Sequence, residues 1–595
     1  MSIIDIYKRI FKIISPHRKK KLYFSIFGGI ANSLIDIIAL SSIFPAIYIA
    51  TNPRVINSNK ILNNIFQFLR FTNEDMFVLF ILFIILLLFL FRMLFNLMVL
   101  KYQYSVSLGA ASEFSEKMSK VFFLKNILEI KRTTLGELDK EIRLLPVQFS
   151  NFVLVPLTII ISEMVVIFLI LLSIISINYK LFFILVISIF PVVGVIYWFI
   201  RRKIQHLGID LNTAATKSFN NSRELISGFA DIKMQNKSSF FITRLLDSIK
   251  IYNSIQIRIN LYQQIIPKLL EWSALALVVL IYIYAILFNE SKSEVLMLLA
   301  IYLAAAYRLL PSLNRINSSL LLIKQYEFIL DVFEKSKGEL ESKNVMCSDK
   351  FSDNLSFNDS IVMDSISLSY SSGDSGLVLK SISLKIKKGE MIGIIGKSGS
   401  GKTSLVYVLS GLLPANAGRI LVDGVEVNSS NLHLWQQKIA FVYQDIFLVN
   451  SNILDNVAFG KDRKNVDEKK VWECLKAVCL DEYVAALPNG LYTMVGESGG
   501  FLSGGQKQRL VIARALYRDA SLIIMDEATS ALDENTQEEV IKSLFETSQR
   551  YGITVLLIAH RLSSLKYCNR IIQLENGEID NEFTYQDLFK ENNNH

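Results

Sequence analysis

Cysteine is scarce in this chain of 595 residues, which has four in all: Cys347, Cys474, Cys479 and Cys568. Their spacing fits no metal-ligand pattern, so we expect reduced thiols in a cytosolic environment. The chain also lacks a stacking-aromatic pattern or a base-reading motif, and its net charge of +9 therefore gives no reason to expect a nucleic-acid partner. Met1 to Lys21 is basic and amphipathic without a small-residue cleavage site, so we expect no cleavable signal peptide.

Apolar residues are abundant instead. They make up 51% of the chain and give a mean hydropathy of +0.37, and most of the excess lies before about residue 335. A helix needs about 20 apolar residues to cross a hydrocarbon core. The sequence predicts six such spans, at Leu22 to Tyr48, Met76 to Leu100, Val155 to Ile177, Leu181 to Ile200, Ile265 to Phe288 and Val295 to Ile323.

Basic clusters predict how these spans are oriented. His17 to Lys21 precedes the first span and Arg201 to Lys203 follows the fourth, so both ends should face the cytosol, where basic residues meet anionic lipids. An even number of spans places both termini on that side. We therefore expect an integral, multi-pass protein of a bacterial inner membrane, with its soluble half in the cytosol.

A glycine-rich loop is the first motif of the soluble half that indicates a chemical function. Gly396 to Thr403 lies between an apolar run suited to a buried strand, Met391 to Ile395, and a predicted helix, Thr403 to Leu412. Such a loop points successive backbone N–H groups at nucleotide phosphates, while Lys402 reaches the β and γ oxygens and Thr403 ligates magnesium. ATP and Mg²⁺ are the cofactors that this motif indicates.

About a hundred residues further on the chain reads Leu502-Ser503-Gly504-Gly505-Gln506, and the whole soluble segment resembles the nucleotide-binding domain of ATP-binding cassette (ABC) transporters. The resemblance implies that Tyr370 stacks on adenine and that Gln444 joins magnesium and the attacking water to the membrane domain. Asp526 would hold magnesium, Glu527 would polarise the water, and His560 would sense the γ-phosphate. The nucleotide contacts that it implies further are Gly396, Lys397, Ser398, Gly399, Ser400, Gly401, Lys402, Thr403, Ser404, Leu502, Ser503, Gly504, Gly505, Gln506 and Asp533.

The same resemblance implies the architecture. A transmembrane domain of six helices with the type I exporter fold would occupy residues 1–335, a linker 336–357, and an α/β P-loop ATPase domain 358–595. In this family Leu502 to Gln506 serves the nucleotide on the opposing domain, so the working unit should be a dimer of two such chains, or of this chain with a related half-transporter. Short coupling helices that touch the ATPase are expected near Leu124 to Lys131 and Leu225 to Ile232.

Charged residues inside the predicted spans bear on what is carried. At 1.5 Å per residue from the outer ends, Arg92 lies about 24 Å deep, Arg308 about 20 Å and Lys268 about 30 Å. Such charges face a wet cavity or an anionic partner, or else they snorkel to the interface or pair with acids such as Glu271. Arg315 could simply mark the cytosolic end of its span. Arg308, Ser312, Arg315 and Ser319 share one helix face, which would line the pathway.

The regions around Arg92, Lys268 and Arg308 resemble bacterial lipid-linked oligosaccharide flippases, which also carry an amphipathic helix in the first outside loop. A helix-spaced apolar face occurs in that loop here, at Ile61, Leu62, Ile65, Phe66, Phe68 and Leu69. The resemblance implies ATP-driven flipping of a polyprenyl-diphosphate-linked saccharide, with those three basic residues on the pyrophosphate. A peptide or bacteriocin exporter and a multidrug or lipid exporter of the same class are the alternatives.

Overall fold

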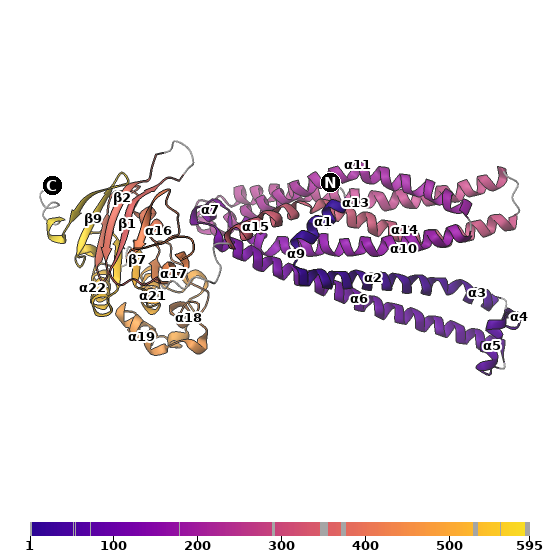
Figure 1. Cartoon of the computed structure of the whole chain (residues 1–595), viewed down its shortest axis with the longest axis horizontal. Coiled ribbons are helices and arrows are strands. Elements are labelled where there is room, and N and C mark those ends of the chain that lie inside the picture. Colours follow the sequence, from indigo (N-terminus) through magenta and orange to yellow (C-terminus); the bar gives the residue numbers. More distant parts are fainter. Residues whose placement is uncertain are drawn as a thin grey trace. The chain divides into compact units, whose positions relative to one another are not determined.

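The computed structural model describes residues 3–51, 53, 55–71, 73–177, 179–287, 292–344, 355–370, 376–527, 533–559 and 561–588. The chain divides into two compact units (Figure 1). The first unit consists of Met1–Lys125 and Glu129–Ser342, and the second of Asn126–Leu128 and Lys343–His595.

The first unit is entirely helical. Its longest helix has 51 residues, which at 1.5 Å per residue is about 75 Å, more than twice the thickness of a hydrocarbon core. The helices are α1 (Ile3–Ile13), α2 (Pro16–Ser41), α3 (Ile43–Thr51), α4 (Val55–Ser58), α5 (Lys60–Phe68), α6 (Glu74–Leu124), α7 (Ile127–Arg132), α8 (Leu135–Asp139), α9 (Leu145–Phe149), α10 (Val155–Ile177), α11 (Tyr179–Ser227), α12 (Phe229–Met234), α13 (Ser238–Leu287), α14 (Lys292–Gln325) and α15 (Phe328–Asn344).

Four helical segments among the described residues are long and apolar enough to cross a membrane: Pro16–Ala39, Glu74–Leu124, Gly136–Ser176 and Ser238–Leu280. They coincide with the first, second, third and fifth predicted spans. The fourth and sixth predicted spans lie within the helices α11 and α14, where many side chains are outside the described set. The chain is thus an integral membrane protein, and the count of six spans stays a prediction.

The first predicted span is not one helix but two. α2 ends at Ser41 and α3 begins at Ile43, inside the run that the sequence presents as continuous. Pro45 explains the break, because its ring lacks the N–H that would bond to the carbonyl group of Ser41 and clashes with that group. The Ser42 hydroxyl donates to the Ala39 carbonyl oxygen at 2.7 Å and closes the turn.

Short helices occur near both predicted coupling segments. α7 starts three residues after the predicted Leu124, and α12 starts four residues after the predicted Leu225. Asn126–Leu128, which includes the start of α7, belongs to the second unit by its contacts. The role of both helices in coupling stays a prediction.

Two π-helical runs flank α9, at Lys140–Leu144 (η1) and Ser150–Leu154 (η2). A π-helical turn accommodates one residue more than an α-helical turn. Residues 135–177 nevertheless form one continuous helical path, from α8 through to the end of α10. The apolar periodicity of the sequence shows neither run, because each adds a single residue.

The predicted first outside loop contains the expected helix, α5, but its apolar residues point in two directions. Leu62 and Phe66 pack with Phe77 at the start of α6. Phe68 is 85% exposed, and Ile65 is exposed beside it. One side of α5 therefore anchors the helix, and the other leaves an apolar face of the kind that lies at a membrane surface.

The second unit contains two sheets. An antiparallel sheet has the order β2-β1-β4-β5, and a mainly parallel sheet has the order β10-β9-β3-β8-β7-β6. The strands are β1 (Ser360–Leu368), β2 (Leu379–Lys387), β3 (Met391–Ile395), β4 (Ala417–Val422), β5 (Val425–Glu426), β6 (Ile439–Val442), β7 (Leu522–Asp526), β8 (Thr554–Ile558), β9 (Arg570–Glu575) and β10 (Glu578–Phe583). The helices are α16 (Lys402–Leu409), α17 (Leu432–Gln437), α18 (Ile453–Val457), α19 (Glu468–Ala477), α20 (Asp481–Ala485), α21 (Gly504–Tyr517) and α22 (Glu534–Tyr551).

Buried strands and helices form the core of the second unit. The strand predicted at Met391–Ile395 is β3, and its side chains are almost wholly buried, as expected for a parallel strand. The predicted helix after it stops at Leu409 rather than Leu412, because Gly411 takes a left-handed φ of 68° that ends an α-helix. Among the described residues the cysteines Cys474, Cys479 and Cys568 are free thiols, and burial raises the pKa of Cys568 to about 12.

Candidate nucleotide site and intramembrane ion pairs

The glycine-rich loop connects the end of β3 to the start of α16. Gly396 has a φ of 149°, and a Cβ there would lie 2.3 Å from the Leu574 carbonyl oxygen, so only glycine fits. The Lys402 ammonium, on the first residue of α16, donates to the carbonyl oxygens of Gly396 at 2.7 Å and Lys397 at 2.9 Å. Burial lowers the pKa of Lys402, whereas the charges of Glu527 and Asp526 act to raise it. The loop thus holds a buried cation at its centre.

Tyr370 lies next to this loop. Its hydroxyl shares a hydrogen bond of 2.5 Å with the hydroxyl of Ser404, on the first turn of α16. The Tyr370 residue is 37% exposed. The structure therefore brings together an aromatic and a loop residue that are 34 positions apart in the sequence.

The acidic residues follow β7, two strands from β3 in the same sheet. Asp526 is the last residue of β7 and is buried. Glu527 follows with a φ of 51°, a left-handed conformation that is costly for a non-glycine residue and is typical of functional sites. The Gln444 side-chain amide, two residues after β6, donates to a Glu527 carboxylate oxygen at 2.9 Å. The carboxyl edge of this parallel sheet therefore gathers the loop, both acids and the glutamine.

The segment Leu502 to Gln506 starts a helix. The Ser503 backbone N–H donates to the Gln506 side-chain oxygen at 2.8 Å, and the Gln506 N–H donates to the Ser503 hydroxyl at 3.3 Å, which is a capping box for α21. The N–H groups of Gly504 and Gly505 belong to the first turn, where they are available to an anion. Sequence reasoning did not anticipate this structural role of Ser503 and Gln506.

Two other predicted nucleotide contacts, Asp533 and His560, follow β7 and β8 in the sequence. Asp533 caps α22, and the hydrogen bond that its carboxylate accepts from the Thr536 N–H lowers the pKa of Asp533. His560, two residues after β8, lies outside the described residues, as do residues 528–532 before Asp533.

Ion pairs join the charged residues of the predicted spans. The six predicted spans contain four bases, Arg92, Lys268, Arg308 and Arg315, and three acids, Asp36, Glu163 and Glu271. Every one of these bases pairs with one of these acids. The count leaves an excess charge of +1 for each chain.

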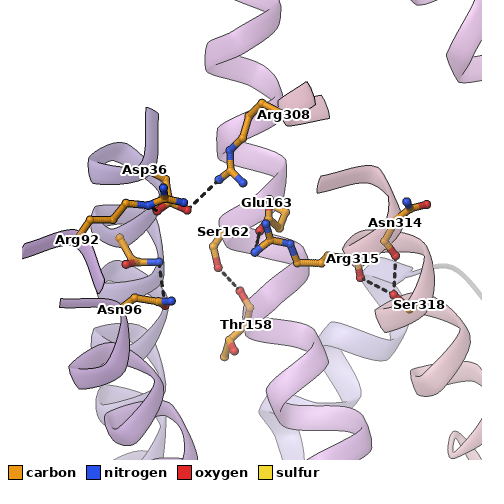
Figure 2. A network of polar contacts seen from close by, with 11 residues as sticks. Asp36, Arg92, Asn96, Thr158, Ser162, Glu163, Arg308, Asn314, Arg315 and Ser318 are labelled. Carbon is orange, nitrogen blue, oxygen red and sulfur yellow. Dashed lines mark hydrogen bonds and ion pairs between the residues drawn. The ribbon is translucent and has the colours of Figure 1, made fainter. Parts of the chain in front are cut away.

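Asp36 on α2 is shared by two arginines (Figure 2). One carboxylate oxygen accepts from the Arg92 Nε on α6 at 2.5 Å, and the other accepts from an Arg308 terminal nitrogen on α14 at 3.2 Å. The side chains of Asp36 and Arg308 are each 10% exposed, and that of Arg92 is 27% exposed. Arg92 and Arg308, which were predicted together from their depth, therefore do meet, through a carboxylate that the prediction did not include.

Glu163 on α10 makes a second ion pair. One of its oxygens accepts from Arg315 at 2.9 Å, and the other is buried without a hydrogen-bond partner. Among the described residues, the buried atoms Arg308 Nε, Ser312 Oγ and Asn314 Oδ1 lack partners as well. In Figure 2 the side chains of Glu163 and Arg315 point toward each other between α10 and α14.

Lys268 does not share an acidic partner with these arginines. Its ammonium binds Glu271 on the same helix, α13, at 2.9 Å, and its side chain is 72% exposed. This is the pairing with Glu271 that the sequence left open as the simpler interpretation. Lys268 keeps its place in the substrate hypothesis only as a proposal.

Asp36 and Glu163 are the site residues that the sequence analysis missed. Each is the sole acid of its predicted span, and an ionisable residue inside a span is by itself a sign of function. That signal was present in the sequence. It was overlooked because only the bases were considered as ligands of an anionic substrate.

Comparison with known proteins bears on the fold and the class of the chain. Residues 379–530 match the ABC transporter family. A solved structure described as a bacterial Atm1-family ABC exporter with ATP bound superposes with a TM-score of 0.78, covering 97% of each chain at 19% identity. These findings show that residues 379–530 belong to the ABC transporter family and that the chain has the fold of an ABC exporter.

Named relatives narrow the class. An ATP-dependent lipid A-core flippase of Ralstonia nicotianae is 44% identical over 216 residues, which are 36% of each chain. A flippase of the same name from Saccharophagus degradans is 30% identical over 402 residues, 67% of this chain and 66% of the relative. The matched region thus spans about a third of the first relative and about two thirds of the second. Within its class the chain resembles the lipid flippases.

Proposed function

We propose that this chain is an ATP-driven flippase that moves a polyprenyl-diphosphate-linked oligosaccharide outward across a bacterial inner membrane, with its ATPase domain in the cytosol. The observation that carries the proposal is the convergence of Arg92 and Arg308 on one buried carboxylate among apolar helices. Two guanidinium groups held together in a membrane span form a receptor for phosphate oxygens, which arginine binds with two parallel hydrogen bonds.

The nucleotide chemistry follows from the edge of the parallel sheet. Lys402 and the loop Gly396 to Ser404 would bind the phosphates, and Tyr370 would stack on the base. Glu527, oriented by Gln444 at 2.9 Å, would accept a proton from the attacking water, with His560 on the γ-phosphate. Leu502 to Gln506 and Asp533 would act at the nucleotide of the opposing domain.

Magnesium fits this donor set. Thr403, Gln444 and Asp526 offer hydroxyl, amide and carboxylate oxygens, which are the ligands that Mg²⁺ prefers. In the described part of the chain no group of three or more histidines, cysteines or acids could hold a metal by itself. The three residues would therefore hold Mg²⁺ jointly with phosphate oxygens, and the ion would neutralise charge on the transferred group.

A dimer completes the proposal. Two copies of the chain, or this chain with a related half-transporter, would close around two ATP molecules, with the first turn of α21 serving the partner's nucleotide. Closure and reopening would alternate the access of the substrate cavity. In a homodimer the excess of +1 for each chain doubles, which suits a diphosphate.

The test must remove the arginines without leaving Asp36 charged and unpaired, since an uncompensated buried charge costs about 3–5 kcal/mol. The triple variant Asp36→Asn, Arg92→Gln, Arg308→Gln meets this condition. Arg143→Ala is the control, because Arg143 is an exposed arginine that pairs with Asp139 outside the predicted spans.

The assay follows labelled lipids in proteoliposomes of the full chain. Wild type and Arg143→Ala should show ATP-dependent loss of a fluorescent polyprenyl-diphosphate sugar from the leaflet on the ATPase side. The triple variant should bind nucleotide normally and flip none. Undiminished flipping by the triple variant would remove the phosphate-binding role of the arginines.

A second candidate substrate is lipid A-core, because the two named relatives are flippases of that lipid. The same assay with lipid A-core as the labelled lipid separates the candidates. Transport of peptides or drugs without transport of either lipid would favour the other exporter functions.

A further inference from the structure

Asp36 occupies the position that the proposed head group would have to take. Its two oxygens bind two different helices, α6 through Arg92 at 2.5 Å and α14 through Arg308 at 3.2 Å. Both arginines meet the same carboxylate, so their donors point at one place (Figure 2). Asp36 itself is 7% exposed. A ligand that uses these donors must therefore compete with Asp36.

The competition is unequal for reasons of charge and geometry. One carboxylate carries a single negative charge and cannot neutralise two guanidinium groups. Arg308 also keeps its Nε–H buried without a partner, so Asp36 leaves one donor unused. A diphosphate carries more charge and more acceptor oxygens than a carboxylate, and it can satisfy both guanidinium groups and that donor together.

We propose that Asp36 is a resident counter-ion that sets the specificity of this site, holding Arg92 and Arg308 until a head group with more negative charge than a carboxylate displaces it. This inference rests on the proposed function, because it names what competes for the same arginines. Zwitterionic lipids, which are abundant in every membrane, do not displace Asp36. The bound diphosphate does, and Asp36 takes the arginines back when the head group leaves.

A second role follows from the helices that are joined. While Asp36 is bound, α2, α6 and α14 are tied at one point. Displacement of the carboxylate transfers both arginines to the substrate and frees α2 from α14. The substrate therefore changes which helices are connected, in addition to occupying the site.

Glu163 provides a matched control. It is also a buried carboxylate in a span, with a side chain 5% exposed, and it also binds an arginine. Its hydrogen-bonded partner is Arg315, which is half exposed, and it makes no hydrogen bond to the donors that hold Asp36, although its charge also acts on Arg308. Glu163→Gln thus removes the same charge from the same region while leaving the pairing of Asp36 intact.

The experiment uses the full chain in nanodiscs of zwitterionic lipid, with stimulation of ATP hydrolysis as the readout. The probes are undecaprenyl diphosphate, phosphatidate as a monophosphate lipid, and free pyrophosphate. Asp36→Asn should lower the half-saturating concentration of undecaprenyl diphosphate about tenfold, the value of one charge-assisted hydrogen bond, and should allow phosphatidate to stimulate. Asp36→Glu and Glu163→Gln should behave as wild type. Stimulation by free pyrophosphate would show that the site takes the head group without the lipid tail.

Each outcome decides between the ideas. If wild type responds to undecaprenyl diphosphate and Asp36→Asn responds no better, Asp36 is not a competitor and only this inference falls. An equal gain in affinity for undecaprenyl diphosphate in Glu163→Gln would also overturn the inference, because the loss of negative charge anywhere in this region would then explain the effect. If neither wild type nor Asp36→Asn responds to any probe, the proposed function fails and takes the inference with it. Asp36→Asn leaves two guanidinium groups without their counter-ion and should lower the thermal midpoint, so nucleotide binding by each variant is the check that the chain is folded.

Discussion

Gly208 offers a direct test of how the first unit is packed. It lies within α11, where a Cβ would stand 2.1 Å from the carbonyl oxygen of Gln325, at the end of α14, and 2.9 Å from the carbonyl carbon. Real Cβ atoms do not approach closer than about 3.0 Å, so Gly208→Ala forces the two backbones apart by at least 0.9 Å. No side-chain rotation relieves this contact, because every close neighbour is backbone.

The expected magnitude follows from two opposed effects. Overpacking costs about 1–3 kcal/mol, whereas alanine favours a helix over glycine by about 1 kcal/mol. Gly338→Ala isolates the second effect, because Gly338 is an exposed residue of α15 whose Cβ would meet no described atom within 4 Å. The strain is therefore the difference between the two variants, and we expect Gly208→Ala to be the less stable by about 1–3 kcal/mol.

Thermal unfolding of the purified full chain measures this difference. Gly338→Ala should raise the unfolding midpoint slightly, and Gly208→Ala should lower it. Gly208→Ala should also lower the basal rate of ATP hydrolysis, because Gln325 lies at the end of α14, directly before α15. Equal midpoints for the two variants would refute the close approach of α11 and α14.

Three further predictions concern the rest of the chain. Glu527→Gln should lower the rate of ATP hydrolysis by about 10²–10⁴ with nucleotide binding retained, measured by phosphate release and equilibrium binding. Trp435→Phe removes a buried N–H donor to a backbone carbonyl at 2.7 Å and should cost about 1–3 kcal/mol, seen as a lower unfolding midpoint. The Arg9 hydrogen bond lowers the pKa of Glu334, so this pair stabilises above the ordinary glutamate pKa of about 4.3 and is lost as pH falls below it. Glu334→Gln should therefore lower the midpoint at pH 7 by the equivalent of about 1 kcal/mol or less, and the difference from wild type should vanish in acid.

The local features of the ATPase half were predictable because short stretches of sequence determine them. Gly396 must be glycine for its own backbone conformation, and Met391 to Ile395 is apolar because a parallel strand is covered on both faces. The capping box at Ser503 and Gln506 was also readable, since a serine three residues before a glutamine is a helix-start pattern.

Long-range features were not predictable in the same way. Asp36 meets Arg308 across 272 positions, and no periodicity specifies which helices of a bundle approach each other. The break at Ser42 was readable in principle from Pro45, but apolar composition alone made the span look continuous. The bond between Tyr370 and Ser404 likewise depends on how two segments of the second unit pack.

The π-helical runs η1 and η2 have a consequence for how this protein tolerates deletions. Each run holds one residue more than an α-helix needs, so removing one residue from 140–144 or 150–154 converts the run to a regular helix and leaves α10 in phase. The helix between Val155 and Glu163 contains no extra residue. Removing one residue there rotates the Glu163 carboxylate by about 100° around the helix axis. A deletion of one residue is thus tolerated within either π-helical run, whereas the same deletion between Val155 and Glu163 moves Glu163 away from Arg315.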